Sequence, residues 1–340
     1  MGGEALRVLL EHPEVQIAWA TTRTGEPLEH FHRNLMGADV PWIPPDEITR
    51  CDAVFVASPT GVAMGLAPQL VEAGTKIIDL GSDFRLRNRA DWERLYRLEH
   101  ACWDLAQEAV YGIPELHREE IRAARVIANP GCFSSAAILG LAPLVKANMI
   151  DRGSIVIDGL SGTAGVGAEL SEASHHPEIG NNVVPYNVID HRHTYEMEQE
   201  LGLLGGEAVR VHFTPAYIPI TRGILAICHC FPINRALRRE ELLDLYRAFY
   251  EPEPFVKVFD QPKEPEASWQ YRPYPWVAAV SGTNYCHVGL DVDERRGRIV
   301  VFSVLDSIGK GGAHAGVQNL NILFGLKETT GLLRHGLHPY

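Results

Sequence analysis

The sequence predicts two domains, a doubly wound α/β domain and an α+β domain built on a mainly antiparallel sheet. With 340 residues the chain is long for a single hydrophobic core. Up to Ala128, short apolar runs alternate with helical patterns, as in a parallel sheet covered by helices. After the helix that follows Cys132, strand-like runs dominate, which favours antiparallel pairing.

The first domain is predicted from the order of its elements. Residues 1–10 have a helical pattern, and residues 15–20 are predicted to form a strand. The fully apolar run 53–57 suits a strand buried on both faces, and 76–80 and 125–128 are the next strands. A nucleotide-binding fold opens with a strand and a glycine-rich turn before its first helix. We therefore expect that one strand and most of a phosphate-binding loop are missing ahead of Gly3.

The second domain is predicted to be rich in strands. The segment 293–297, Asp-Glu-Arg-Arg-Gly, suits a hairpin turn, and 261–268 reads as an exposed loop. The predicted strands are 154–158, 208–213, 224–231, 277–280, 286–292 and 298–305.

The composition is that of an ordinary globular protein, with 46% hydrophobic and 22% charged residues. The net charge of −12 argues against general affinity for nucleic acid or anionic membranes. No apolar run approaches the length of a membrane span, and no signal peptide opens the chain, so we expect a cytoplasmic protein. The six cysteines include no C-x-x-C pair, which predicts free thiols and no metal site.

The chemistry is predicted at the strand-to-helix turn that carries Cys132. Asn129-Pro130-Gly131 must break the preceding strand, and apolar residues then recur at helical spacing from Ile138. Cys132 thus falls near a helix N-terminus, where unpaired N–H groups and the positive end of the helix dipole lower a thiol pKa. The pattern alone also allows a buried structural cysteine.

Two further segments carry candidate binding and acid–base groups. His191 and His193 stand at the start of a helix, in His-Arg-His-Thr-Tyr-Glu. Either histidine could act as acid–base beside a thiolate, although loop histidines are often merely solvated. Ser161-Gly162 opens a glycine-rich loop whose amides could cradle an anion. Arg23 follows the second predicted strand, where an arginine accommodates the 2′-phosphate of NADP, unless it is only a solvated surface residue.

Several motifs resemble one family, the N-acetyl-γ-glutamyl-phosphate reductases, which are relatives of aspartate-semialdehyde dehydrogenase. The active-site signature is Ala-Asn-Pro-Gly-Cys-Phe at 128–133. The other motifs are Gly-Ser-Asp-Phe-Arg-Leu (81–86), Tyr-Gly-Ile-Pro-Glu-Leu (111–116), His-Arg-His-Thr-Tyr-Glu (191–196) and Asp-Ser-Ile-Gly-Lys-Gly-Gly-Ala (306–313). The resemblance runs from Gly2 to about Gly325. The chain departs from the family at Ser134-Ser135, usually Pro-Thr or Ala-Thr, and at Tyr195, usually proline.

The resemblance implies an NADP-dependent reductase of N-acetyl-γ-glutamyl phosphate in arginine biosynthesis, with an acyl-phosphate substrate and a homo-oligomer, a dimer or tetramer. It implies a Rossmann-like NADP-binding domain at 1–130 and 311–340, and a catalytic and dimerisation domain at 131–310. It places Cys132, His191, His193 and Glu196 in catalysis and Arg85, Asn129 and Arg222 at the substrate. On the cofactor side it places Gly3, Thr22, Arg23, Pro59, Gly61, Ser161, Gly162, Lys310 and Gly311.

Two alternatives stay open. The segment 174–178, Ser-His-His-Pro-Glu, and the ending at 336–339 resemble reductases of carrier-protein-linked α-aminoadipyl or glutamyl phosphates in lysine and arginine biosynthesis. Against this branch, the net charge of −12 would repel a small acidic carrier. The second alternative is a truncated, catalytically impaired remnant that acts as a scaffold, and the expected loss of the N-terminal strand is its only support.

Overall fold

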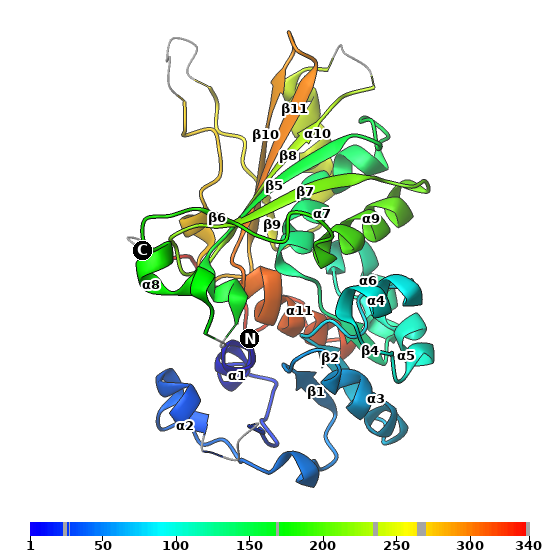
Figure 1. The fold of residues 1–340 in the computed structure, drawn as a ribbon, viewed down its shortest axis with the longest axis vertical. Helices are drawn as coiled ribbons and strands as arrows, with labels where there is room; N and C mark the ends of the chain where they lie inside the picture. Colours follow the sequence, from blue (N-terminus) through cyan, green and yellow to red (C-terminus); the bar gives the residue numbers. More distant parts are fainter. Residues whose placement is uncertain (23–25, 27, 168–169, 234–236, 264–269, 338–340) are drawn as a thin grey trace.

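The computed structural model describes residues 1–340 except 23–25, 27, 168–169, 234–236, 264–269 and 338–340. The strands form two sheets, one of four strands and one of seven, which lie at opposite ends of the molecule (Figure 1). In the part of the chain that is described, no helix has the length and apolar character that a membrane crossing requires.

The four-stranded sheet is entirely parallel, as predicted for the first domain. Its strands, in spatial order, are β1 (Ala53–Val56), β2 (Lys76–Asp79), β4 (Val126–Ala128) and β3 (Val110–Tyr111). The register places Val56 beside Asp79 and Asp79 beside Ala128, so three strands end at one edge of the sheet. The turn that carries Cys132 begins at this edge.

Helices from both ends of the chain pack on the parallel sheet. The apolar side of α1 shares a core with Ile78 and Ile127 of the sheet and with Val317 of α11. Residues near the C-terminus therefore return to the first domain. The helices around this sheet are α1 (Gly2–Leu10), α2 (Leu28–Phe31), α3 (Val62–Glu72), α4 (Arg89–Tyr96), α5 (Trp103–Glu108), α6 (Pro114–Ala123) and α11 (His314–Leu323).

The seven-stranded sheet is mixed, with mostly antiparallel neighbours. Only the β5–β7 and β9–β10 pairs are parallel. The hairpin predicted at 293–297 is confirmed, since it joins β10 to β11 in antiparallel register. The strands, in spatial order, are β6 (Val184–Pro185), β7 (Val211–Tyr217), β5 (Ile155–Ser161), β8 (Ile224–Cys230), β11 (Arg298–Leu305), β10 (Cys286–Asp293) and β9 (Val256–Val258).

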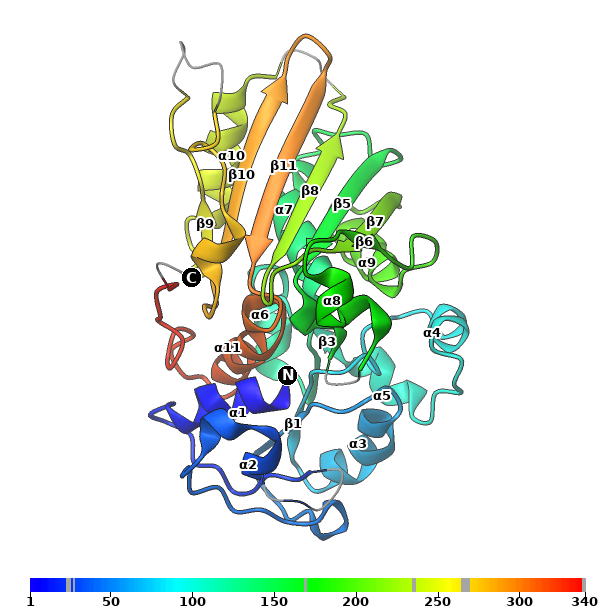
Figure 2. The ribbon, with the colours of Figure 1, turned by 60° about the vertical axis from the view of Figure 1, so that its left-hand side comes forward.

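Helices cover one face of this sheet, as Figure 2 shows. They are α7 (Cys132–Lys146), α9 (Arg192–Gly205) and α10 (Arg239–Tyr250), and the short α8 (His176–Ile179) lies apart from them. Residues alternate strictly between buried and half-buried along β5 and β8. The half-buried set includes Leu160, Leu225 and Ile227, which form an apolar patch on the face opposite the helices.

Two predicted strands are wrong. The segment 15–20 forms no strand, because of its six residues only Ala20 makes a bridge, to Trp42. The segment 277–280 is a 3₁₀ turn, because it is short and its N–H groups bond locally rather than to a neighbouring strand. The helix predicted at the start of the chain is confirmed as α1.

Candidate active site

Cys132 is the first residue of α7, directly after the Asn129-Pro130-Gly131 turn that leaves β4. The predicted strand-to-helix position is therefore confirmed. The thiol is partly buried, and Gly311 approaches it so closely that a Cβ at position 311 would lie 2.9 Å from the Cys132 Cβ. The glycine-rich turn 309–313 thus forms one wall beside the thiol.

The expectation of a lowered thiol pKa is wrong for this structure. Burial raises the pKa of Cys132 to about 11, and the Phe133 N–H and the Arg85 and Arg192 guanidinium groups only partly oppose this rise. Desolvation of the thiolate therefore outweighs the helix N-terminus. Cys132 needs a neighbouring base to become a nucleophile near neutral pH.

Glu196, fully buried in α9, connects the elements around the Cys132 turn. Its Oε2 accepts hydrogen bonds from the Tyr111 hydroxyl at 2.6 Å and from the Gly131 N–H at 2.9 Å. Its Oε1 lies 3.4 Å from an Arg85 Nη and 3.9 Å from His193 Nε2. The carboxylate therefore fixes the residue just before Cys132.

The two candidate histidines lie in different positions. His193 packs directly over Gly131, where a side chain would collide with its ring, so no larger residue fits there. His191 instead caps α9, because its Nδ1 accepts the His193 N–H at 3.1 Å. Burial lowers the pKa of His193 well below its usual value and the pKa of His191 to about 4. Both rings are neutral at pH 7.

The predicted substrate residues Arg85 and Asn129 are buried and hold the turn itself. Arg85 donates to the Asn129 carbonyl at 2.8 Å and to the Leu80 carbonyl at 3.4 Å, besides pairing with Glu196. The Asn129 amide donates to the Gly312 carbonyl at 3.1 Å. Their polar groups thus bind other parts of the chain in this structure.

Arg222, the second predicted anion holder, is also paired. Its Nε donates to Asp306 at 2.8 Å, and an Nη donates to Glu4 at 2.9 Å. His314 contacts the same Glu4 oxygen at 2.9 Å. These four residues form a charged junction that connects α1, the β7–β8 loop, the end of β11 and the start of α11.

Three predicted cofactor residues, Gly3, Pro59 and Gly61, stand in α1 and in the segment directly after β1. Gly3 packs against the His32 ring, and Pro59 is exposed after β1. The Gly61 N–H donates to the Asp83 carboxylate at 2.9 Å, which caps α3. Thr22 bonds the Glu26 carbonyl at 2.9 Å, and the predicted Arg23 lies outside the described residues.

The other predicted cofactor residues lie beside the second sheet, and their polar groups bond within the chain. The Gly162 N–H donates to the Gly223 carbonyl and the Ser161 hydroxyl to the Gly162 carbonyl, so neither group is free for an anion. Lys310 is buried, with Nζ 2.6 Å from both Glu115 and Gln318. Of this set only Gly311 lies against Cys132.

Sequence reasoning missed three tyrosines near the thiol. One is Tyr111, whose hydroxyl donates to Glu196. Tyr186 and Tyr217 stack with ring centroids 4.0 Å apart, and Cys132 acts electrostatically on both. Burial raises both phenol pKa values, so these hydroxyls stay neutral. No short motif marks either residue.

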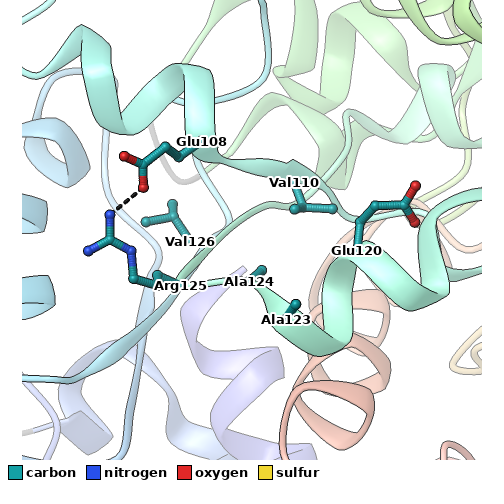
Figure 3. Close-up of a pocket in the computed structure, with 7 residues that line it drawn as sticks. All are labelled: Glu108, Val110, Glu120, Ala123, Ala124, Arg125 and Val126. Carbon is teal, nitrogen blue, oxygen red and sulfur yellow. Dashed lines mark hydrogen bonds and ion pairs between the residues drawn. The ribbon is translucent and has the colours of Figure 1, made fainter.

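One surface hollow lies away from this chemistry. It holds about 230 Å³ between α5, α6 and the beginnings of β3 and β4, and Glu108 and Arg125 form an ion pair at its rim (Figure 3). Cys132 follows the opposite end of β4. Within the described ranges no group of histidine, cysteine or carboxylate side chains could hold a metal ion.

Comparison with solved structures identifies the fold. Aspartate semialdehyde dehydrogenase II of Vibrio cholerae, complexed with ASA, is similar with a TM-score of 0.69 and 18% identity over 95% of both chains. Aspartate semialdehyde dehydrogenase of Candida albicans, solved with NADP, is similar with a TM-score of 0.62 and 18% identity over 95% of both chains.

Comparison of sequences identifies the family. The model of the semialdehyde dehydrogenase NAD binding domain matches residues 1–124, and that of the semialdehyde dehydrogenase dimerisation domain matches residues 132–307. The N-acetyl-gamma-glutamyl-phosphate reductase of Pelotomaculum thermopropionicum is 42% identical over 99% of this chain and 96% of its own. That of Methanopyrus kandleri is 44% identical over the same shares. The chain therefore belongs to the N-acetyl-gamma-glutamyl-phosphate reductases, within the semialdehyde dehydrogenase family.

Proposed function

We propose that this chain reduces N-acetyl-γ-glutamyl phosphate to N-acetylglutamate semialdehyde and phosphate with NADPH, a step of arginine biosynthesis. The observation that carries the proposal is the assembly of Cys132, His193 and Glu196 around one strand-to-helix turn. The relatives, about 42% identical over nearly the whole chain, bear this activity in their names.

In this mechanism Cys132 is the nucleophile and His193 moves the proton. Neutral His193 takes the thiol proton as Sγ attacks the acyl carbon, and the C–O bond to phosphate breaks to leave a thioester. NADPH supplies the hydride that reduces this thioester. Protonated His193 would hydrogen-bond the resulting alkoxide. That alkoxide collapses as its C=O bond forms and the C–S bond breaks, which releases the aldehyde and the Cys132 thiolate, and His193 then returns its proton to the thiolate. Glu196 would orient His193. The hydrogen bond that Glu196 accepts from the Gly131 N–H would keep the turn in place.

The cofactor would lie at the edge where the parallel strands end, as in other dinucleotide-binding sheets. The start of α1 meets the end of β1 there, since a Cβ on Gly2 would lie 3.2 Å from that of Ala57. Helix N-termini favour phosphate groups. We assign residues 1–130 and 311–340 to the cofactor-binding domain. The choice of NADP as the cofactor is supported by the Candida albicans neighbour, which was solved with NADP.

The protein would act as a homo-oligomer that buries the apolar patch of Leu160, Leu225 and Ile227. These side chains stand on the sheet face opposite α7, α9 and α10. A second copy related by two-fold symmetry would present the same patch and cover it. The matching dimerisation-domain model includes all three residues. Nothing observed favours the carrier-linked substrate, and the assembly of the catalytic groups argues against the scaffold alternative.

The test is replacement of Cys132 by serine, with Cys102→Ser as the matched control. Cys102 is also partly buried at the start of a helix, α5. NADPH formation is measured from N-acetylglutamate semialdehyde, NADP and phosphate. We expect Cys132→Ser to lose activity on the order of 10³-fold or more and Cys102→Ser to keep it. An active Cys132→Ser protein would refute the thioester route.

A further inference from the structure

In an acyl phosphate, a doubly charged phosphate group is bonded through an oxygen atom to the carbon that Cys132 attacks. A site for it needs a cation whose donors are free, because guanidinium groups bind phosphate through paired N–H donors. The two arginines predicted for this role are Arg85 and Arg222. The structure pairs Arg85 with Glu196 and Arg222 with Asp306 and Glu4.

Arg192 is the arginine near Cys132 that has no such partner. It occupies the first position of α9, between the capping His191 and the acid–base candidate His193. Its side chain is exposed, and among the described residues it forms no ion pair and no side-chain hydrogen bond. Its guanidinium lies 6.0 Å from the centroid of the Tyr96 ring, which limits the directions it can take while leaving its N–H donors free.

The positive charge of Arg192 also acts on the pKa values of Cys132 and of two tyrosines near it. Burial raises the pKa values of Cys132, Tyr186 and Tyr217, and Arg192 is close enough to act against the rise at all three. Arg85 is the one other arginine among the groups that act on the Cys132 thiol most strongly. His193 adds a second indication of a ligand, since its buried Nδ1 has no hydrogen-bond partner among the described residues.

We propose that Arg192 holds the phosphoryl group of the substrate beside Cys132, and that inorganic phosphate occupies the same place in the reverse reaction. The inference rests on the proposed function. An exposed arginine suits this group better than the substrate carboxylate, because the phosphate must leave while the rest of the substrate stays bound as a thioester.

Steady-state kinetics of the full chain in the aldehyde-oxidising direction test the assignment. We expect Arg192→Ala to raise KM for phosphate about 10- to 100-fold and to leave KM for aldehyde and for NADP within about twofold. Arg192→Lys should recover part of the loss, since an ammonium supplies charge without the paired donors. Arg87→Ala is the control for net charge, because Arg87 is also exposed and its backbone bonds Gln199 of α9.

A rise in KM for the aldehyde or for NADP, with KM for phosphate unchanged, would overturn the assignment. A second measurement needs no turnover: the rate at which iodoacetamide alkylates Cys132, followed by mass spectrometry. Phosphate should slow this reaction in wild type and Arg87→Ala but not in Arg192→Ala. Equal protection of all three proteins would also overturn it. If wild type is protected through Arg192 yet does not oxidise N-acetylglutamate semialdehyde, the proposed substrate is wrong and the phosphate site stands.

Discussion

His191 and His193 stand two residues apart in one motif and both rings pack against Phe133, yet their ring nitrogens have different surroundings. His193 lies over Gly131, whereas the Nδ1 of His191 is used to cap α9. The sequence alone left the choice between them open. The capping bond, which depends on the backbone direction at the start of α9, separates their roles.

Replacing each histidine by alanine should therefore give different results. For His193→Ala we expect kcat to fall about 10²- to 10⁴-fold, because proton transfer to and from the thiol is lost. For His191→Ala we expect the free energy of unfolding to fall by about 1 kcal/mol through loss of the helix cap, with a smaller effect on kcat. Kinetics and urea unfolding measure the two effects, and His191→Asn, which keeps a capping acceptor, is the control. Equal losses of kcat would contradict the division.

Charged residues were the least predictable part of the site. Short motifs marked both Cys132 and Glu196, and the structure brings them to one strand-to-helix turn, Cys132 as the first residue of α7 and Glu196 through the hydrogen bond that it accepts from the Gly131 N–H. Arg85 and Lys310 were expected at ligands, but they bond Glu196 and Glu115, which are 111 and 195 residues away in sequence. A sequence shows that a charge is present, and only the fold shows whether another residue already neutralises it.

At the scale of elements, α7 contains a defect that α10 repairs. Pro143 has no N–H, so the Leu139 carbonyl four residues earlier lacks its helical donor. The hydroxyl of Tyr250 donates to that carbonyl, and the hydroxyl of Tyr246 donates to the Gly140 carbonyl at 2.6 Å. All of these groups are buried. The packing of α10 thus supports the helix that carries Cys132.

Tyr250→Phe should lower the free energy of unfolding by about 1–3 kcal/mol, because it leaves the Leu139 carbonyl buried and unpaired. Tyr246→Phe is the matched control with a smaller expected loss, since the Gly140 carbonyl keeps its helical donor, the Leu144 N–H. Urea unfolding of both variants measures the difference. A loss that is no larger for Tyr250→Phe would show that the proline defect is satisfied in another way.

Elements were predictable where strong alternation or a turn signal defined them, as in the β10–β11 hairpin. The segment 15–20 failed because a strand requires a neighbour as well as a suitable pattern, and the described residues offer it only the Ala20–Trp42 bridge. The short strand β9 was missed, since three residues, Val-Lys-Val, give no period to read.

At the scale of the whole molecule, the apolar patch on the open sheet face predicts self-association. Ile227 stands between Asp158 and Phe302 in neighbouring strands, so Ile227→Glu should place an unpaired charge in the interface. Sedimentation equilibrium should show a dimer or larger assembly for wild type and a monomer for the variant. Leu203→Glu, at a half-exposed position on α9, should not change the mass. A monomeric wild type would contradict the oligomer.

The burial of α7 between its two end residues has a consequence for the substitutions that this protein can accept. Every residue from Phe133 to Val145 is buried, and a Cβ on Gly140 would lie 3.1 Å from the Cβ of Ser303. A close-packed interior accepts few changes of volume. Substitutions more than a turn away from Cys132 would therefore move the nucleophile by shifting its helix. Mutational tolerance along α7 should be as narrow as at the active site, although most of its side chains never meet a substrate.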